Sequence, residues 1–395
     1  MPAAPTAGRA VEAAAGDDHD AMRDLRDDVL ARGAELGLDA VGVTTAEPFA
    51  DTRRTLDQRK AQGLHGGMAF TYRNPARSTE PQRSLDGAKA IVVAARSYRR
   101  EPPPAAANEP VPPTARVARY SWEDHYAHLR DALARIGERL AADGWRSKVV
   151  VDDNALVDRA AAHRAGIGWY GKNTNLLLPN AGSWFVLGSL VTDAPLPPTA
   201  LEPIGEGCGA CDRCLVSCPT GALVAPGVLD ARRCLAWLLQ ATGAFPREYR
   251  EALGGRIYGC DDCQEVCPPN RMLDRKLPPP RASADAQPWV DLVAMLAMGD
   301  DELLATFGRW YVPRREARYL RRNALVALGN VGDARDGRVV AAVAAALAHD
   351  DPLVRAHAVW AAARLGRHDL LTAVEADRSS EVAAELCALP PSRTR

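Results

Sequence analysis

The 395-residue sequence has no run of eighteen apolar residues, and its N-terminus has neither the apolar core of a signal peptide nor a twin-arginine pair. These absences argue against a membrane span and against export. The formal net charge is only −1, so nucleic acid or membrane could be attracted only by a local patch. We therefore expect a cytoplasmic protein without membrane contact, in a compartment where thiols stay reduced.

Extremes of composition are also missing. The chain is 47% hydrophobic and 25% charged, which excludes a disordered or fibrous protein and suits two or three globular domains. Strand-like and helix-like stretches both occur, and we expect a multidomain α+β protein. Pro-rich stretches at 101–113, 194–205 and 278–288 mark an exposed loop and two domain boundaries.

Eight of the nine cysteines lie in one segment, which is the strongest functional signal. The first group reads C-G-A-C-D-R-C-L-V-S-C-P from Cys208 to Pro219, the C-x2-C-x2-C-x3-C-P spacing of bacterial two-cluster ferredoxins. In this pattern the fourth cysteine binds the other cluster. A second triplet lies in Y-G-C-D-D-C-Q-E-V-C-P at 258–268, and Cys234 lies between the two groups.

The crosswise ligand pattern divides these eight cysteines into two sets of four. We expect one [4Fe-4S] cluster on Cys208, Cys211, Cys214 and Cys267, and the other on Cys218, Cys234, Cys260 and Cys263. Zinc sites and disulfides are the alternatives, although zinc sites do not need this spacing. Cys387, left over in an Ala-rich helical tail, is expected to be a buried small apolar residue.

The first half of the chain predicts a sheet covered on both faces. A helix is expected through Leu25 to Leu36, followed by strands at 39–43, 90–95, 148–153 and 183–192. The strand at 148–153 ends in carboxylates and a helix over 156–165 follows it. In an α/β sheet, such a strand end is the usual place for a ligand-facing group.

Asp152 is the acid that this arrangement favours. It follows an apolar V-V-V run that could desolvate it, and a desolvated carboxyl can act as an acid near neutral pH. The alternative is a helix N-cap. The nearby G-I-G-W-Y-G-K-N-T-N at 166–175 allows close ligand approach, but it is not a G-x4-G-K-[ST] phosphate loop.

The C-terminal part predicts a helical repeat and a basic patch. The pattern R-x-x-A-x-x-A-x-x-x-[VL]-G begins at Arg321 and recurs 34 residues later at Arg355, as in stacked helical pairs of the HEAT type. The stretch 309–322 has six arginines, one glutamate and three aromatic residues. Guanidinium groups and aromatic faces suit phosphate and unstacked bases, although a solvated helix edge would also be arginine-rich.

Taken together, the motifs resemble those of epoxyqueuosine reductase, a cobalamin-dependent iron–sulfur enzyme of queuosine synthesis in tRNA. The matching segments are V-D-D-N-A-L-V-D-R-A at 151–160, A-G-I-G-W-Y-G-K-N at 165–173, A-G-S-W at 181–184, the cysteine array, and L-R-R-N-A-L-V-A-L-G-N at 320–330. The resemblance covers roughly residues 22–366. A plain ferredoxin lacks the first three segments and the arginine-rich helical tail.

The resemblance implies two [4Fe-4S] clusters, base-off cobalamin, and reduction of epoxyqueuosine at the wobble position of the anticodon. It implies Asp152 as the proton donor and a C-D-D-C turn that places the second cluster beside the corrin. The expected cofactor-binding residues are Ser97, Asp152, Lys172, Asn173, Ser183, Asp261 and Asp262. The expected tRNA-binding residues are Arg314, Arg315, Arg318, Arg321 and Arg322.

The same resemblance implies a domain order. We expect a disordered tail at 1–20, an α/β cobalamin-binding catalytic domain at 21–195, a ferredoxin-like domain at 196–280, and HEAT-like tRNA-binding helices at 289–395. We also expect a monomer that receives electrons from a low-potential donor such as flavodoxin or ferredoxin. The rival classes are a reductive dehalogenase, a ferredoxin-type electron carrier, and an RNA-binding module with structural zinc.

Overall fold

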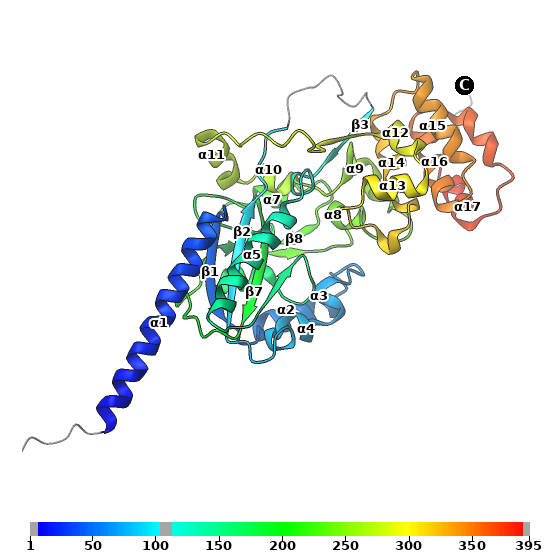
Figure 1. Ribbon diagram of the computed structural model, residues 1–395. Helices are drawn as coiled ribbons and strands as arrows, with labels where there is room; N and C mark the ends of the chain where they lie inside the picture. The colour runs from blue at the N-terminus through cyan, green and yellow to red at the C-terminus, as the bar shows by residue number, and fades with distance from the viewer. Residues whose placement is uncertain (1–6, 103–112, 390–395) are drawn as a thin grey trace, which may run out of the picture.

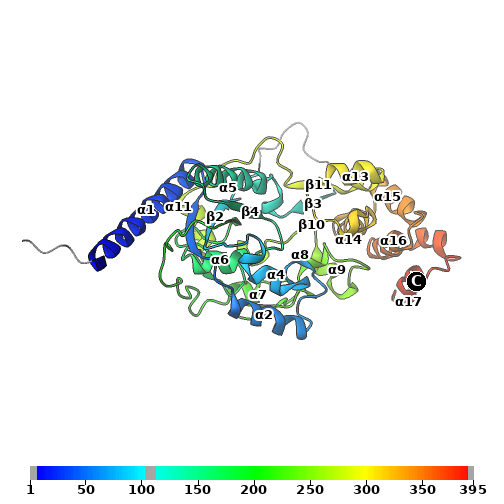
Figure 2. The ribbon, with the colours of Figure 1, turned by 60° about the horizontal axis from the view of Figure 1, so that its bottom comes forward.

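The structure of the protein, a computed structural model, describes residues 7–102 and 113–389 (Figure 1). A four-stranded sheet with its helices is followed by a module of short elements that carries the cysteines and by a tail of packed helices. Figures 1 and 2 both show helices α8 (Leu235–Leu238) and α9 (Arg247–Leu253) of the cysteine module between the sheet and the tail. Most of the Pro-rich stretch 101–113 lies outside the described residues.

No helix in the described part of the chain is both long enough and apolar enough to cross a membrane. Helix α1 runs from Ala7 to Glu35 and extends away from the rest of the molecule (Figure 1). The prediction of a disordered tail at 1–20 is therefore wrong from Ala7 onward, and residues 1–6 lie outside the described residues. The physical reason is local, since this stretch is rich in alanine, the best helix former.

The main sheet has the strand order β1-β2-β7-β4. Its strands are β1 (Ala40–Thr45), β2 (Ala90–Ser97), β7 (Phe185–Thr192) and β4 (Ser147–Val151), and every neighbouring pair is antiparallel. In the register, Val92 lies opposite both Val43 and Leu190. Side chains of β2 are buried on both faces of the sheet, as its continuous apolar run predicts.

Helices cover both faces of this sheet. On one face α1 and α5 (His125–Ala142) contribute Val29, Leu133 and Ile136 to a core with Val92 and Leu190. On the other face α6 (Asp158–Arg164) buries its alanines against strand residues of β2 and β7. The two-sided cover was predicted, but the strand direction was not, because an α/β sheet is mostly parallel and this one is antiparallel.

A group of short helices follows β1 along the chain. It consists of α2 (Ala50–Ala61), α3 (Phe70–Arg73), α4 (Pro75–Thr79) and the 3-10 turn η1 (Pro81–Arg83). The hydroxyl of Ser78 in α4 donates a 2.8 Å hydrogen bond to the carbonyl oxygen of Asn154. This contact fixes the short helices against the loop that contains Asp152.

The cysteine module is built from short helices and strands between 208 and 276. Besides α8 and α9 these are α7 (Arg213–Val216), β8 (Leu223–Ala225), β9 (Val228–Leu229), β10 (Arg256–Tyr258), α10 (Asp262–Glu265) and α11 (Pro268–Lys276). Strand β10 pairs with β3 (Thr114–Val117), which also pairs with β11 (Trp289–Asp291). This second sheet therefore joins segments from all three parts of the chain.

The tail consists of helices that pack on one another and on the cysteine module. They are α12 (Leu292–Ala297), α13 (Asp300–Thr306), η3 (Pro313–Arg315), α14 (Arg318–Val331), α15 (Gly337–Leu347), α16 (Pro352–Arg364), η4 (His368–Val374) and α17 (Ser380–Cys387). The two copies of the sequence repeat form α14 and α16, whose small residues allow close contact: a Cβ on Gly329 would lie 2.6 Å from Trp360. A HEAT-type assignment stays a prediction.

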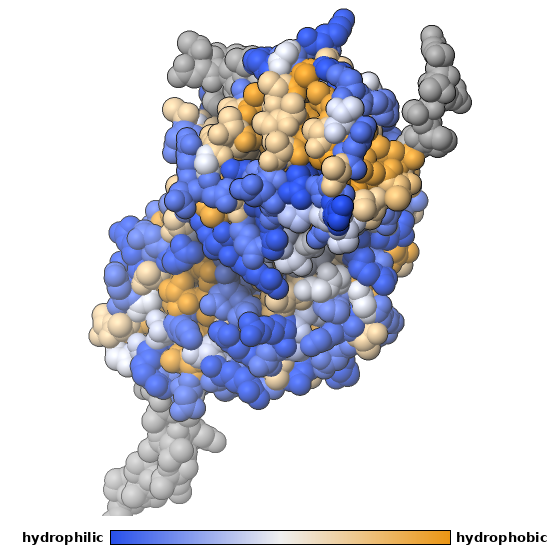
Figure 3. Space-filling view, turned by 90° about the vertical axis from the view of Figure 1, so that its right-hand side faces the viewer, coloured by the Kyte–Doolittle hydropathy of each residue, from blue (hydrophilic) through white to orange (hydrophobic). Residues whose placement is uncertain are grey.

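Cys387 lies near the end of α17 and is exposed, so the expectation that it is buried is wrong. The buried positions of this helix are instead Val382 and Glu385. Glu385 accepts a 2.7 Å hydrogen bond from Arg250 of α9, and this ion pair fixes α17 to the cysteine module. Figure 3 shows apolar side chains gathered on the tail at the top of that view, above a mainly hydrophilic surface.

Candidate active site

The pKa shifts of the clustered cysteines indicate which thiols lie close enough to influence one another. Burial raises the pKa of Cys267 to about 11, and the nearby thiols of Cys208, Cys214 and Cys211 add to the shift. Cys267 of the second triplet thus lies near three cysteines of the first, and the crosswise assignment of these four to one cluster stays a prediction.

The second set forms around Cys234. Burial raises the pKa of Cys260 to about 12, with further contributions from Asp262 and Cys234, and it raises the pKa of Cys234 with a contribution from Cys218. The pKa of Cys263 lies well above its usual value because of burial and the thiols of Cys260 and Cys234. All nine cysteines are free, so the disulfide alternative is wrong.

Among the described residues, no three His, Cys, Asp or Glu side chains converge in a way that suits a single metal ion. A cubane cluster places fewer demands on convergence, because each of its four thiolates binds a different iron.

Cys218 shows how the protein favours the thiolate form of a cysteine. Burial alone would raise the pKa of the Cys218 thiol, but the backbone N–H groups of Thr220 and Ala222 lower it. Ala222 N lies 3.2 Å from Cys218 Sγ.

The glycine-rich segment after α6 contacts the cysteine module. It contains the short strands β5 (Trp169–Tyr170) and β6 (Leu176–Leu177). Lys172 Nζ donates a 2.6 Å hydrogen bond to the carbonyl oxygen of Gly209, and buried Asn173 donates through its amide to the carbonyl oxygen of Cys263 at 3.5 Å. These two predicted cofactor-binding residues therefore link the sheet domain to the loops that hold the clusters.

Ser183 belongs to a second, buried link. Its hydroxyl donates to Gln264 Oε1 at 2.9 Å, and its backbone N–H donates to Asn270 Oδ1 at 2.7 Å. Tyr98, at the end of β2, donates its hydroxyl to the same Gln264 oxygen at 3.0 Å. Ser97 lies half-buried beside Tyr98, and its N–H donates to Asp39 at 2.8 Å.

Asp261 and Asp262 of the C-D-D-C turn make internal contacts. Asp261 is buried and accepts a 2.8 Å hydrogen bond from the backbone N–H of Arg119, next to the 3-10 turn η2 (Arg119–Ser121). Burial raises the pKa of Asp261 to about 6. Asp262 pairs with Arg256 through two hydrogen bonds of 3.2 and 2.5 Å. The Asp262 carboxylate is thus held by a guanidinium at the turn that carries Cys260 and Cys263.

Asp152 follows β4 and has a φ of 52°, in the left-handed region that non-glycine residues rarely adopt. Such strain is often stored at functional sites. The side chain is exposed, and yet burial raises its pKa, with Asp153 adding to the shift and Arg130 opposing it. The N-cap alternative is wrong, because Val157 occupies the N-cap of α6. The carboxylate of Asp153 accepts a 2.8 Å hydrogen bond from Ala155 N and so fixes the turn after β4.

Two tyrosines of the first half of the chain, Tyr126 and Tyr170, combine partial solvent access with a pKa raised by burial. Tyr126 is half-buried, and its pKa is raised by burial and by the charges of Asp152 and Asp158. Tyr170 is 39% exposed, and burial raises its pKa. Tyr126 also contributes to the raised pKa of Tyr98, whose hydroxyl donates a hydrogen bond to Gln264 of α10. Pairwise contacts therefore run from Asp152 through Tyr126 and Tyr98 to Gln264, which follows the C-D-D-C turn.

Asp158 is a second acid at this site, and the same V-D-D-N-A-L-V-D motif contains it. One of its carboxylate oxygens is buried without a hydrogen-bond partner, and Ser189 Oγ of β7 is also buried without one. Burial raises the pKa of Asp158 to about 8, and the charge of Asp152 adds to the shift. This shift favours the protonated form of the Asp158 carboxyl.

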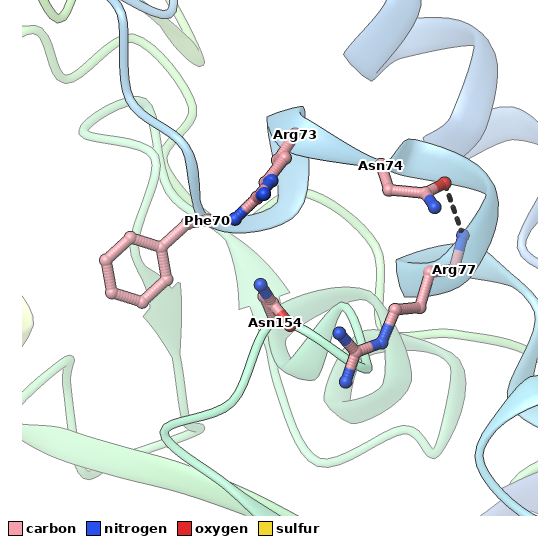
Figure 4. A pocket seen from close by; sticks show the side chains of 5 residues that line it. All are labelled: Phe70, Arg73, Asn74, Arg77 and Asn154. Carbon is pink, nitrogen blue, oxygen red and sulfur yellow. Dashed lines mark hydrogen bonds between the residues drawn. The ribbon is translucent and has the colours of Figure 1, made fainter.

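A pocket of about 300 Å³ opens beside the Asp152 loop (Figure 4). It is lined by Phe70, Arg73, Asn74, Arg77 and Asn154. Sequence reasoning missed these residues, because no motif of the first half brought 70–77 together with Asn154. Their only signal was a pair of arginines and an aromatic residue in a short stretch.

The predicted tRNA-binding arginines separate into two groups. Arg314 and Arg315 are exposed, and Arg318 is half-buried beside Glu316 and Asp351. The prediction is wrong for Arg321 and Arg322, which are buried. Arg321 donates to the carbonyl oxygen of Met298 at 2.6 Å.

Arg322 is fully buried and holds the segment after α8. It donates to the carbonyl oxygens of Ala241 and Gly243 at 2.7 and 2.6 Å, and to those of Leu238 and Leu239 at 3.2 and 3.3 Å. These are carbonyls at and beyond the C-terminal end of a helix, which attract a cation. Its role is therefore structural.

The comparisons with known proteins agree with this site. Residues 207–270 match the family model of the 4Fe-4S double cluster binding domain. Fold and site together define an iron–sulfur oxidoreductase. Residues 78–153 match the model described as "Epoxyqueuosine reductase QueG, DUF1730". The epoxyqueuosine reductase of Bacillus anthracis is 33% identical over 364 residues, 89% of this chain and 92% of the relative. The chain belongs to the epoxyqueuosine reductase family.

Solved structures give the same result. A crystal structure of an epoxyqueuosine reductase with an epoxyqueuosine-modified tRNA stem loop has a TM-score of 0.82 and 31% identity, covering 92% of this chain and 97% of that one. An epoxyqueuosine reductase from Bacillus subtilis, with its catalytic aspartate loop swung out of the active site, has a TM-score of 0.81, 31% identity, and covers 92% of this chain and 98% of that one. The similarity extends over the sheet, the cysteine module and the tail.

Proposed function

We propose that the protein reduces epoxyqueuosine to queuosine at the wobble position of tRNA anticodons. The observation that carries this proposal is the position of Asp152. Asp152 directly follows β4 with a strained backbone and an exposed side chain, and it lies within the segment that matches the epoxyqueuosine reductase model. Relatives whose names state this activity, and one solved with a modified tRNA stem loop, support the assignment.

The reaction needs two electrons and two protons for each epoxide. Both C–O bonds of the epoxide break, a carbon–carbon double bond forms between the two ring carbons, and the oxygen leaves as water. No amino-acid side chain supplies low-potential electrons, so we assign them to an external donor such as flavodoxin or ferredoxin and to the two clusters. We assign a proton to Asp152, whose raised pKa favours the neutral form at pH values where an ordinary aspartate is charged.

We further propose that base-off cobalamin binds between Asp152 and the C-D-D-C turn. Tyr126, which is half-buried near Asp152, would offer an aromatic surface to the corrin, and Ser97 and Asp152 would offer polar groups to its peripheral amides. Cobalamin would contribute a low-potential cobalt between cluster and substrate. Asp261, Asp262, Asn173 and Ser183 would support that site indirectly, because their polar atoms already bond within the protein.

The tail is proposed as the RNA-docking part, with Arg314, Arg315 and Arg318 as contacts and a HEAT-like helical arrangement as the scaffold. The domain divisions at 21–195, 196–280 and 289–395 belong to the same proposal. We also propose that one copy of the chain suffices for the reaction.

The test is a product assay with anaerobically purified protein reconstituted with iron, sulfide and cobalamin. A stem-loop RNA carrying epoxyqueuosine is incubated with this protein and a low-potential reductant, and the nucleosides are analysed by mass spectrometry. The expected product has lost one oxygen atom. Reduced clusters with unchanged RNA would favour an electron carrier, and release of halide from an aryl halide with unchanged RNA would favour a dehalogenase.

A further inference from the structure

The pocket beside the Asp152 loop combines cationic, amide and aromatic groups. In Figure 4 the side chains of Arg73, Arg77 and Asn154 turn toward one space, and Phe70 lies at one end of it. Asn74 Oδ1 accepts a hydrogen bond from Arg77 N at 3.1 Å, which fixes the start of α4. The walls of the pocket are thereby held in place before any ligand arrives.

The charges in this pocket are largely unneutralised. Arg77 has one acidic neighbour, Asp153, at 3.7 Å, and both side chains of this pair are about half exposed. The Arg73 guanidinium has no ion-pair partner among the described residues. Two guanidiniums that share one carboxylate leave a net positive charge for an anion, and a planar guanidinium suits phosphate oxygens in particular.

An exposed aromatic pair lies at the edge of the pocket. Phe70 is 38% exposed and Tyr311, from the tail, is 44% exposed, and their ring centroids are 6.0 Å apart. Tyr311 is held by its backbone N–H, which donates to the hydroxyl of Tyr258 at 2.8 Å, while its ring stays exposed. Rigid, exposed aromatic rings are what unpaired bases stack on.

The position of the pocket connects two parts of the proposed RNA site. Asn154 is two residues after Asp152, and Tyr311 is three residues before Arg314. A phosphate held here would belong to a nucleotide close to the group that reacts at Asp152. A volume of about 300 Å³ is at the lower end for ligand pockets and suits one nucleotide.

We propose that this pocket and Tyr311 form a subsite for a nucleotide adjacent to the reacting one, with Arg73 and Arg77 on its phosphate and Phe70 and Tyr311 against its base. This inference rests on the proposed function, because it presumes an RNA substrate. A docking site for an acidic electron-donor protein is the competing use of such a patch. The pocket favours RNA, since it is concave and opens beside Asp152 instead of beside a cysteine set.

The test uses the full, cofactor-loaded protein and a fluorescent anticodon stem-loop, with affinity measured by anisotropy at several salt concentrations. Tyr311→Ala should weaken binding about 5- to 150-fold, the range for loss of one stacked base, and Tyr311→Phe should bind like the wild type. Arg73→Gln should reduce the slope of log affinity against log salt by about 0.7 for one phosphate contact. Arg54→Gln, an exposed arginine of α2 paired with Asp51, is the matched control and should change neither value.

Two abasic stem-loops, each lacking the base on one side of the wobble nucleotide, identify the stacked base. One of them should bind the wild type more weakly, and that loss should disappear in Tyr311→Ala. If the wild type binds and reduces the stem-loop but Tyr311→Ala and Arg73→Gln bind it equally well, the subsite is wrong and the proposed function stands. If these variants impair only cluster reduction by reduced flavodoxin, the pocket serves the donor and the subsite is overturned. If the wild type neither binds nor reduces the stem-loop, both proposals fail.

Discussion

Arg322 of the tail donates a 2.7 Å hydrogen bond to the carbonyl oxygen of Ala241, seven residues after Cys234. A guanidinium from α14 thus satisfies the backbone that leads away from a predicted cluster ligand. Burial lowers the pKa of Arg322 to about 9, and in the described part of the chain its hydrogen-bond partners are uncharged backbone carbonyls and the side-chain amide of Asn323. The tail is therefore part of the support of the second cysteine set.

Arg322→Ala should destabilise the protein and reduce its iron content. Its removal leaves several buried carbonyl oxygens without a donor, which we expect to cost roughly 3–5 kcal/mol. Thermal unfolding and iron analysis of anaerobically purified protein measure both effects. Arg314→Ala is the control, because Arg314 is exposed, and it should leave the melting temperature unchanged. Equal melting temperatures for the two variants would contradict the structural role of Arg322.

The two cysteine sets predict a specific iron count. The wild type should contain about eight irons per chain, four in each cubane. Cys234→Ser should lower this number to about four, because Cys234 belongs to the second set only. Cys387→Ser should keep all eight, since Cys387 is exposed at the end of α17. Zinc in place of iron in the anaerobic wild type would rule out the cubane assignment.

Asp152→Asn tests the proton donor. The change keeps the shape of the side chain and removes its proton, so epoxide reduction should fall about 10²- to 10⁴-fold while iron and cobalamin are retained. Asp153→Asn is the matched control, because Asp153 holds the local turn and contacts Arg77. We expect it to retain most of the activity. Near-normal turnover by fully loaded Asp152→Asn would transfer the role to Asp158.

Asp158 should make stability depend on pH. Its folded-state pKa of about 8 lies above the value of about 4 for an unfolded aspartate, so the folded protein holds a proton that the unfolded chain releases. Stability should therefore fall as pH rises from about 4 to 8, by at most about 1.4 kcal/mol per unit from this group. Asp158→Asn should flatten that part of the curve, as measured by melting temperature from pH 5 to 8. Parallel curves for variant and wild type would show that Asp158 is not buried as described.

The Gln264 network predicts unequal effects of two substitutions. Gln264 Oε1 accepts from both Tyr98 and Ser183, so Gln264→Ala leaves two buried hydroxyls without this acceptor. We expect it to destabilise the protein by about 1–3 kcal/mol, whereas Tyr98→Phe removes one of two donors and should cost about 0.5–1.5 kcal/mol. Chemical denaturation of matched preparations gives both values. Gln62→Ala, at an exposed position just after α2, should have no effect.

Local patterns predicted the parts of this protein that depend on local geometry. The cysteine spacing fixes which thiols can share a cluster, and the V-V-V run before Asp152 predicts a strand that ends in a carboxylate. Strand direction was not predictable in this way, because Val92 has the same apolar surroundings in a parallel or an antiparallel sheet. The correct neighbours of β2 depend on β7, about ninety residues later in the sequence.

The arginine-rich stretch shows the same limit. A charge count cannot distinguish Arg314 from Arg322, because the partners of Arg322 are carbonyl oxygens about eighty residues earlier. Helix α14 is buried on nearly all sides from Tyr319 to Gly329, although its sequence is amphipathic enough to suggest an exposed edge. The pocket beside Asp152 escaped prediction for a similar reason. Its walls come from α3, α4 and the loop after β4, and they meet only in the folded chain.

The small sheet β10-β3-β11 can form only late during synthesis of the chain. Strand β3 leaves the ribosome early, yet its two partners lie at 256–258 and 289–291, so it cannot pair with β10 until roughly 140 more residues have been made, or with β11 until roughly 170 have. Arg322 and Glu385, which hold the cysteine module, are translated later still. The nascent chain therefore exposes its cysteines before their support is complete. A chain truncated before α14 would lack Arg322 and Glu385, and we expect its cysteine module to be less stable than that of the full chain.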